Sequence, residues 1–144
     1  MNILSKIALT LLFASLLVCT GCEQGSKIVP VEGQVLLDGQ PLAWGSVMVV
    51  PTAGESAFGR LDAQGRFKLC MTIDGRDGCP VGTGHIVAVN SAEAISETHH
   101  RRYAPEIYDK PQNSPLKVDI KEPKKDWIIE LKGDGKKYPY EFKT

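Results

Sequence analysis

The chain contains no apolar run long enough to cross a membrane as a helix. Its longest predominantly apolar run extends from Ile7 to Val18, whereas a spanning helix needs about 20 residues. The run follows Lys6, the only early charge, and precedes Gly21 and Cys22. A charged start followed by a short apolar stretch is typical of a secretory signal peptide. We therefore expect residues 1–21 to be removed on export.

The end of this leader suggests a lipid anchor. Gly21 stands directly before Cys22, and the pair resembles the lipobox of bacterial lipoproteins. The usual pattern has Leu three residues before the cysteine, where this chain has Cys19. Cys19 fits less well as the anchor because the bulky Val18 precedes it. The resemblance implies lipidation at Cys22, which would hold the protein at a bilayer; the alternative is secretion without a lipid.

An excess of basic residues is also missing. The chain has 17 Lys and Arg against 17 Asp and Glu, and removal of residues 1–21 takes away only Lys6. The 144 − 21 = 123 residues that remain have the size of one domain. Because that domain is nearly neutral, it lacks the electrostatic footprint of a nucleic-acid-binding protein. We expect no nucleic acid among its partners.

Cysteine is scarce once the leader is set aside. Cys19 would leave with the signal peptide and Cys22 would carry the lipid, so the domain keeps Cys70 and Cys79. Exported cysteine pairs commonly form disulfides, and these two flank a glycine-rich connection between predicted strands. We expect a bridge between them near the surface, because Cys70 is in the polar phase of its strand. Two unpaired thiols are the alternative.

Signatures of catalytic sites are missing as well. The chain has no H-E-x-x-H zinc motif and no G-x-S-x-G nucleophile turn. His85 is in phase with Val87 and Val89, so we expect it at the edge of the core rather than as a base. His99 and His100 are adjacent and would point to opposite faces of a strand, although in a loop they could share a metal. We expect no catalytic residue, metal site or cofactor.

What the sequence does contain is a repeated alternation of apolar and polar residues, which is typical of strands with one buried face. Its 14 glycines and 9 prolines place turns at short intervals, and Asp38-Gly39 is typical of a tight turn. We expect an all-β domain of about seven strands packed as a β-sandwich. The predicted inward positions are Val29, Val31, Val35, Leu37, Val47, Val49, Phe67, Leu69, Met71, Val87, Val89, Leu116, Val118, Ile120, Trp127, Ile129 and Leu131.

Residues 91–114 break the alternation and are predicted to form a long loop, with at most one helical turn near residues 95–102. The loop contains His99, His100, Arg101, Arg102 and Tyr103. A cluster of donors beside an aromatic residue is typical of interfaces. We expect an interaction loop for an acidic partner or for anionic lipid headgroups. The alternative is a solvated crossover between the sheets.

A series of short motifs supports a more specific assignment. In chain order they are Val31-x-Gly33-x-Val35, Asp38-Gly39-x-Pro41-Leu42, Gly45-x-Val47, Gly65-x-Phe67-x-Leu69, Tyr108-x5-Ser114-Pro115-Leu116-x-Val118 and Ile129-x-Leu131. The series resembles a carboxypeptidase regulatory-like domain and, more narrowly, the planctomycete lipoproteins that consist of a signal peptide and one such domain. The resemblance implies a transthyretin-like, or prealbumin-like, sandwich that serves as an accessory, adhesive or structural module. It implies no peptidase activity, which belongs to a separate zinc domain.

These observations divide the chain into a signal peptide (1–21), a lipidated tether (22–28), a carboxypeptidase regulatory-like sandwich (29–132) and a C-terminal tail (133–144). We expect a membrane-anchored, non-catalytic module of the cell envelope that faces the extracytoplasmic side. Its role would be structural or in protein interaction. The alternative is a module that binds a small ligand or carbohydrate through exposed aromatic side chains. The candidates for that are Trp44, Trp127, Tyr103 and Tyr108.

Overall fold

The computed structural model describes residues 25–144, and that part of the chain is all-β with several sheets. The predicted signal peptide (1–21) and the predicted lipidation site Cys22 lie outside the described residues. The 3-10 helix η2 (Glu106–Tyr108) is the one helix between residues 25 and 144. Nothing in that range is therefore a helix long and apolar enough to span a membrane.

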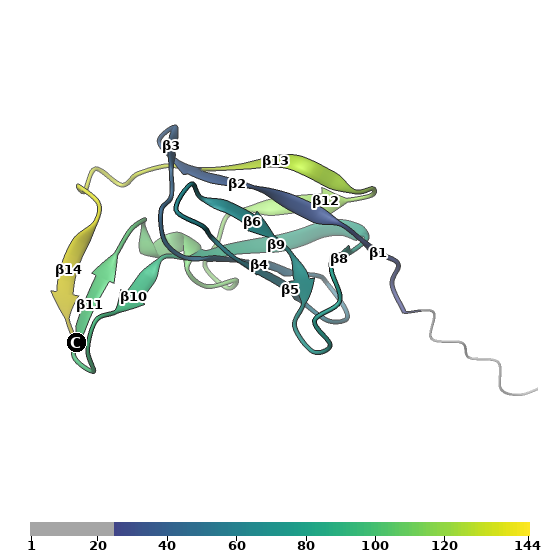
Figure 1. Cartoon of the computed structure of the whole chain (residues 1–144), viewed down its shortest axis with the longest axis horizontal. Coiled ribbons are helices and arrows are strands. Elements are labelled where there is room, and N and C mark those ends of the chain that lie inside the picture. Colours follow the sequence, from purple (N-terminus) through teal and green to yellow (C-terminus); the bar gives the residue numbers. More distant parts are fainter. Residues whose placement is uncertain (1–24) are drawn as a thin grey trace, which may run out of the picture.

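Two larger sheets face each other across one core, an arrangement consistent with the predicted β-sandwich (Figure 1). The first layer is a five-stranded sheet in the order β12-β9-β4-β5-β7, all of whose neighbours are antiparallel. Its strands are β4 (Ser46–Val50), β5 (Ala57–Arg60), β7 (Cys70–Met71), β9 (Gly82–Asn90) and β12 (Lys117–Ile120).

The second layer is built around β2, which pairs in parallel with β13 and antiparallel with β3 and β6. Its strands are β2 (Val31–Leu37), β3 (Gln40–Pro41), β6 (Arg66–Lys68) and β13 (Lys124–Leu131). At one end of the sandwich, β1 (Ile28–Val29) pairs with β8 (Cys79–Pro80). Asp38 and Gly39 form the turn after β2 with φ of 48° and 81°, as the tight-turn prediction requires.

The predicted inward positions form the core. Val35, Val47, Val49, Leu69 and Leu131 have no exposed surface, and full burial of each such aliphatic side chain stabilises a fold by about 1.5–3 kcal/mol. Four of the predicted positions are only partly buried at the rim of this cluster. They are Leu37, Leu116, Val118 and Trp127. The alternation of apolar and polar residues therefore predicted the buried face of almost every strand.

The described residues form fourteen strands rather than about seven. One reason is that a single alternating stretch can change sheets, as residues 66–71 do between β6 in one layer and β7 in the other. Leu69 is the residue at the change: its amide donates to Val31 O at 2.9 Å, and its carbonyl accepts from Gly78 N at 2.8 Å. The alternation continues through the change, so the sequence pattern does not reveal it.

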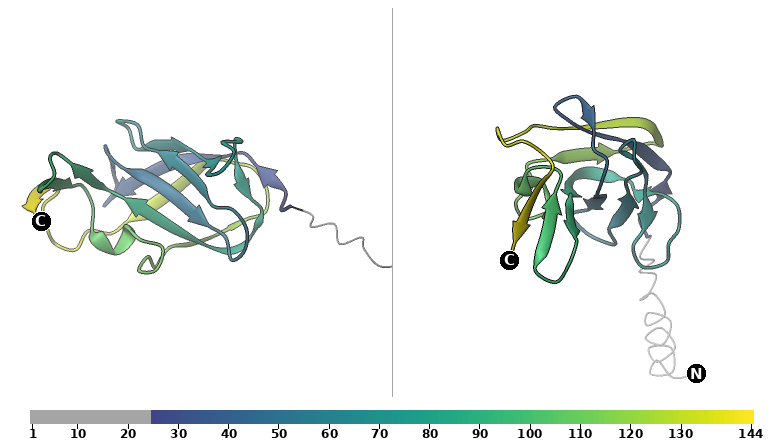
Figure 2. Two further views of the ribbon diagram at one scale, coloured as in Figure 1. Left: turned by 90° about the horizontal axis from the view of Figure 1, so that it is seen from below. Right: turned by 60° about the vertical axis from the view of Figure 1, so that its left-hand side comes forward.

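The structure corrects the prediction of a long loop at residues 91–114. This segment contains β10 (Ala92–Ala94) and β11 (His99–Arg102), which form a hairpin, and the expected helical turn near residues 95–102 is absent from it. The predicted C-terminal tail supplies β14 (Tyr140–Lys143), which pairs with β11. We call β10, β11 and β14 the distal sheet, because it lies at the opposite end of the molecule from β1 (Figures 1 and 2).

The predicted disulfide is also corrected, since Cys70 and Cys79 are both free thiols. Cys79 has no exposed surface and belongs to the core cluster. Cys70 lies outside that cluster, and its Sγ donates to Phe58 O at 3.4 Å. Residues 72–78 form a loop between the two cysteines, and its last residue, Gly78, has φ of 123°. With one sulfur inside the core and the other outside it, the side chains lack the mutual orientation that a disulfide needs.

Candidate functional site

The distal sheet contains four of the five residues of the predicted interaction cluster, and the fifth, Tyr103, follows it directly. β11 is the central strand, with Arg101 opposite Glu93 of β10 on one side and opposite Glu141 of β14 on the other. Successive side chains of a strand point to opposite faces. The sheet therefore separates the cluster into a charged face, with His99, Arg101 and Tyr103, and an aromatic face.

On the charged face, two carboxylates engage the predicted donors. Glu141 accepts from Arg101 Nη2 at 2.6 Å, and its other oxygen lies 2.9 Å from His99 Nε2. Glu93 accepts from the Tyr103 hydroxyl at 2.7 Å and lies 3.8 Å from Arg101. The hydrogen bond with Arg101 holds the pKa of Glu141 below its ordinary value, and the same bond raises the pKa of Arg101. The donors are thus held by this chain's own acids.

The aromatic face carries a row of rings that we call the aromatic row: His100, Phe142, Tyr140 and Tyr138. His100 stacks on Phe142 with centroids 5.3 Å apart and planes 25° apart. Tyr140 lies 6.1 Å from Phe142 and 5.5 Å from Tyr138. Residues 133–144 were predicted to be a tail, but Tyr138, Tyr140 and Phe142 recur at every second position. That period was the available signal for a strand.

The Arg102 side chain is buried and forms structural contacts instead of lying on the surface. Its side chain forms an ion pair with Asp109, and both side chains are only 8% exposed. Burial lowers the pKa of Arg102, but the hydrogen bond and charge of Asp109 outweigh this and leave that pKa raised. Its guanidinium also lies 5.4 Å from the centre of the Phe142 ring. Arg102 therefore ties the distal sheet to the segment that follows η2 and is not free for a partner.

Two of the four aromatic side chains that were candidates for ligand binding lie next to each other. Trp44 is 42% exposed, and its ring lies 6.3 Å from that of Tyr103. A shallow groove beside Trp44 is also lined by three residues that face one another across neighbouring strands: Arg60, Ser46 and Asn90. The sequence does not indicate this juxtaposition, because β9, which contributes Asn90, is distant along the chain from the neighbouring strands β4 and β5.

The other two aromatic candidates are occupied by structural contacts. Tyr108 is buried, and its hydroxyl accepts from Lys132 N at 3.1 Å. Trp127 is partly buried and meets the Phe67 ring edge-on, with centroids 5.8 Å apart. Both side chains therefore contribute to packing, as the core phase of Trp127 predicted.

His85 is 2% exposed, which confirms the predicted place at the core. Its Nε2 lies 2.9 Å from Pro80 O. A carbonyl oxygen only accepts hydrogen bonds, so Nε2 is the donor in this contact. Nδ1 is buried without a hydrogen-bond partner.

The two faces of the distal sheet differ in their chemistry. Its histidines lie on opposite faces of β11, and residues 25–144 contain no group of three or more His, Cys, Asp or Glu placed to hold a metal ion. What the sheet offers is a charged face with balanced acids and bases and an aromatic face with partly exposed rings.

Comparison of the chain with protein-family models, curated proteins and solved structures finds no match.

Proposed function

We propose that this protein is a non-catalytic display module of the bacterial cell envelope. It is held at a membrane by a lipid on Cys22 and presents the distal sheet to a protein partner. The observation that carries the proposal is the arrangement of the two ends: β1, which follows the tether, and the distal sheet lie at opposite ends of the long axis (Figure 1). A domain that is anchored by its amino terminus and stands end-on would hold the distal sheet away from the bilayer.

The fold that we propose is a transthyretin-like sandwich of the carboxypeptidase regulatory-like type. Its support is the place of the motif residues within the two layers. A side chain at Gly33 would come 2.1 Å from Trp127 O, so the first glycine of the motif series allows β2 and β13 to approach closely. Gly65 has φ of 72°, and the turn there brings its carbonyl within 2.8 Å of Val35 N. The motifs thus coincide with the contacts that define the second layer.

The pairing of charges on the distal sheet supports recognition of a protein partner. His99 and Arg101 are both engaged by Glu141, so their charges are balanced within the chain. A paired, nearly neutral surface favours a protein partner with complementary charges, since matched charges contribute specificity. The distal position of these residues also favours such a partner over the anionic headgroups that the sequence left open.

The anchor is tested by mass spectrometry of the mature protein from a bacterial membrane fraction. We expect an acylated amino-terminal peptide that begins at Cys22. The variant Cys22→Ser should leave the membrane fraction, whereas Cys19→Ser should be lipidated normally. An unmodified amino terminus, or one at another residue, would contradict the anchor.

The partner surface is tested by recovery of complexes from detergent-solubilised cells. We expect one envelope protein to be enriched with the native chain and lost with the double variant His99→Ser, Arg101→Ser. The double variant Arg66→Ser, Lys68→Ser is a matched control, because these exposed residues lie on β6 in the sandwich. Equal recovery with all three proteins would contradict the proposed surface.

A second candidate function is glycan binding at the groove beside Trp44. The observation in its favour is the exposed Trp44 ring beside Tyr103, with Arg60 and Asn90 near enough to donate hydrogen bonds to hydroxyl groups. Flat aromatic surfaces next to a few polar groups are suited to such ligands. Co-sedimentation with isolated cell-wall polysaccharide should then depend on Trp44. We expect Trp44→Ala to abolish it and Ile107→Ala, an exposed site elsewhere, to preserve it; equal sedimentation would exclude the groove.

A further inference from the structure

We infer that the loop of residues 72–78 rests on the membrane surface and places Ile73 in the lipid headgroup interface, so that the domain stands end-on. This inference rests on the proposed anchor at Cys22 and extends it, because a lipid on Cys22 alone does not set the orientation of the domain. We call residues 72–78 the foot loop. It connects β7 to β8 at the same end of the molecule as β1 (Figure 1).

The exposure of Ile73 is the first observation. Its side chain is 84% exposed, whereas the other exposed large apolar side chains among the described residues are between 42% and 52% exposed. Single exposed apolar residues are common on protein surfaces. Ile73 differs from them because it is both the most exposed and the one fixed at the end from which the chain leads to the anchor.

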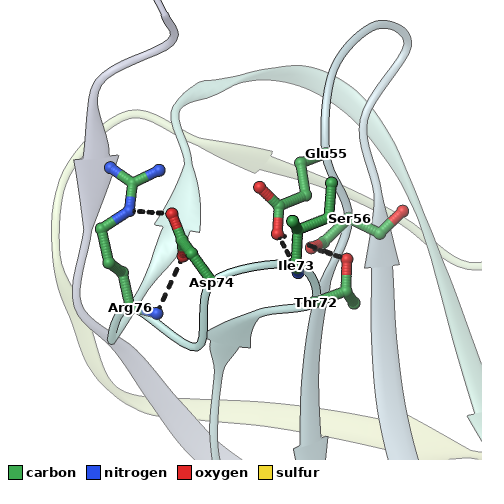
Figure 3. Close-up of polar contacts among 6 residues, drawn as sticks. All are labelled: Glu55, Ser56, Thr72, Ile73, Asp74 and Arg76. Carbon is green, nitrogen blue, oxygen red and sulfur yellow. Dashed lines mark hydrogen bonds and ion pairs between the residues drawn. The ribbon is translucent and has the colours of Figure 1, made fainter.

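The second observation is that the foot loop is held in one conformation (Figure 3). The amide of Ile73 donates to Glu55 Oε1, and Thr72 Oγ1 donates to Ser56 O at 3.1 Å. Asp74 accepts from the amide of Arg76 at 3.0 Å and forms an ion pair with its side chain. These bonds hold Ile73 outward in a fixed direction, so its insertion does not require the loop to become ordered first.

The third observation is the closeness of the foot loop to the tether. Gly25 and Ser26 line the same shallow groove as Arg76 of the foot loop and Glu55. Two residues, Glu23 and Gln24, stand between Cys22 and Gly25, and the three Cα-to-Cα steps from Cys22 to Gly25 span at most about 11 Å. An acyl chain on Cys22 would therefore bring this end of the domain to the headgroup layer.

The pairing of charges in the foot loop favours an apolar contact with the membrane over an electrostatic one. Asp74 is paired with Arg76, and Asp77 is paired with Lys68 at 2.7 Å. The charges within the loop are thus paired, and the neighbouring Glu55 carboxylate accepts from the Ile73 amide, so contact with lipid would come from the Ile73 side chain. The occupant that fits is a lipid interface, and the contact should form on zwitterionic lipids without anionic ones.

The experiment places a nitroxide spin label on the lipidated, mature protein in vesicles of phosphatidylcholine and phosphatidylethanolamine. The labelled variants are Ile73→Cys and Ile95→Cys in a Cys70→Ser parent. Ile95 is the matched control, because it is 44% exposed and follows β10 in the distal sheet. Cys79 can stay, since it has no exposed surface, and the parent without an added cysteine should take up no label.

We expect the label at position 73 to collide severalfold more with oxygen, which concentrates in lipid, and less with a water-soluble nickel chelate than the label at 95. Vesicle flotation is measured on the same samples. If the protein floats but both labels are equally accessible to the chelate, the inference is overturned and the proposed anchor stands. Protection of both labels would also overturn it, because the domain would then lie flat. Failure to float would refute the anchor and the inference with it.

Discussion

At the scale of single residues, the buried polar groups hold the parts of this domain together. Arg102 and Asp109 form an ion pair with little exposure, and Asp109 also accepts from Ser91 N at 3.4 Å. His85 donates from Nε2 to Pro80 O within the core. Buried polar groups cost free energy when their partners are removed. These residues are therefore more sensitive to substitution than the exposed charges of the distal sheet.

The ion pair gives the first prediction. Asp109→Ala leaves the Arg102 charge buried without a partner, and such a change lowers the free energy of unfolding by about 3–5 kcal/mol. Urea unfolding followed by circular dichroism measures this loss. Glu97→Ala, which removes an exposed carboxylate, is the control and should change stability by less than about 0.5 kcal/mol. Equal stability of the two variants would show that the pair contributes little.

The free cysteines give the second prediction. Burial raises the pKa of the Cys79 thiol to about 12, and the thiolate is the reactive form. In the native protein near pH 8, iodoacetamide should therefore alkylate Cys70 and leave Cys79 unmodified. Both should react after unfolding in urea without a reductant. Peptide mass mapping measures the modification, and a Cys70–Cys79 cross-linked peptide from unreduced protein would contradict the free thiols.

At the scale of elements, the distal sheet depends on a strand from the end of the chain. β14 completes the sheet by pairing with β11, and their contact includes the bond between Arg101 and Glu141 as well as the stacking of His100 on Phe142. Exposed ion pairs are worth little individually, so the aromatic row contributes most of the packing between these two strands. The carboxylate nevertheless makes the pairing sensitive to pH.

The third prediction concerns this pH dependence. The pKa of Glu141 is lowered in the folded protein by the hydrogen bond from Arg101. A lowered carboxyl pKa contributes stability above its unfolded value, and that contribution is lost as pH falls through the folded value. We expect the protection factors of β14 amides, which correct for the intrinsic pH dependence of exchange, to fall below about pH 4, while those of β4 amides stay high. In Arg101→Gln the Glu141 pKa, followed by NMR, should rise toward its ordinary value; an unchanged pKa would refute the pairing.

At the scale of the whole molecule, the two layers share one core, and the chain passes from one layer to the other at residues 66–71. Leu69 has no exposed surface and is bonded to Val31 of the second layer and to Gly78 near β8. A side chain at such a crossing contacts both layers. The sandwich should therefore unfold as one cooperative unit, as single domains of this size commonly do.

The fourth prediction tests whether the sandwich unfolds as one cooperative unit. Leu69→Ala removes a buried side chain and should lower the free energy of unfolding by about 2–5 kcal/mol, with fluorescence and circular dichroism reporting one coincident transition. Ile128→Ala, on the outer face of β13 where the side chain is 49% exposed, should change stability by less than about 0.5 kcal/mol. Separate transitions for the two probes would show that the layers unfold independently.

The sequence alone determined most of the inward positions of the strands and that the described part of the chain is all-β. Alternation is a local property, because neighbouring side chains of a strand always point to opposite faces. It therefore predicted the core positions of β2, β4, β9 and β13 and the turn at Asp38-Gly39. It also predicted the burial of His85, which shares the phase of Val87 and Val89.

Tertiary structure decided the partners of those strands and the state of the candidate site. β14 pairs with β11 some 40 residues earlier in the chain, and only that contact turns His99 and Arg101 toward Glu141 instead of toward solvent. The burial of Cys79 likewise depends on where β8 packs in the folded chain, so Cys79 is inside the core while Cys70 on β7 lies outside it. The physical reason is that hydrogen bonds and packing between distant segments depend on which surfaces meet in space, and a local pattern of residues does not encode that choice.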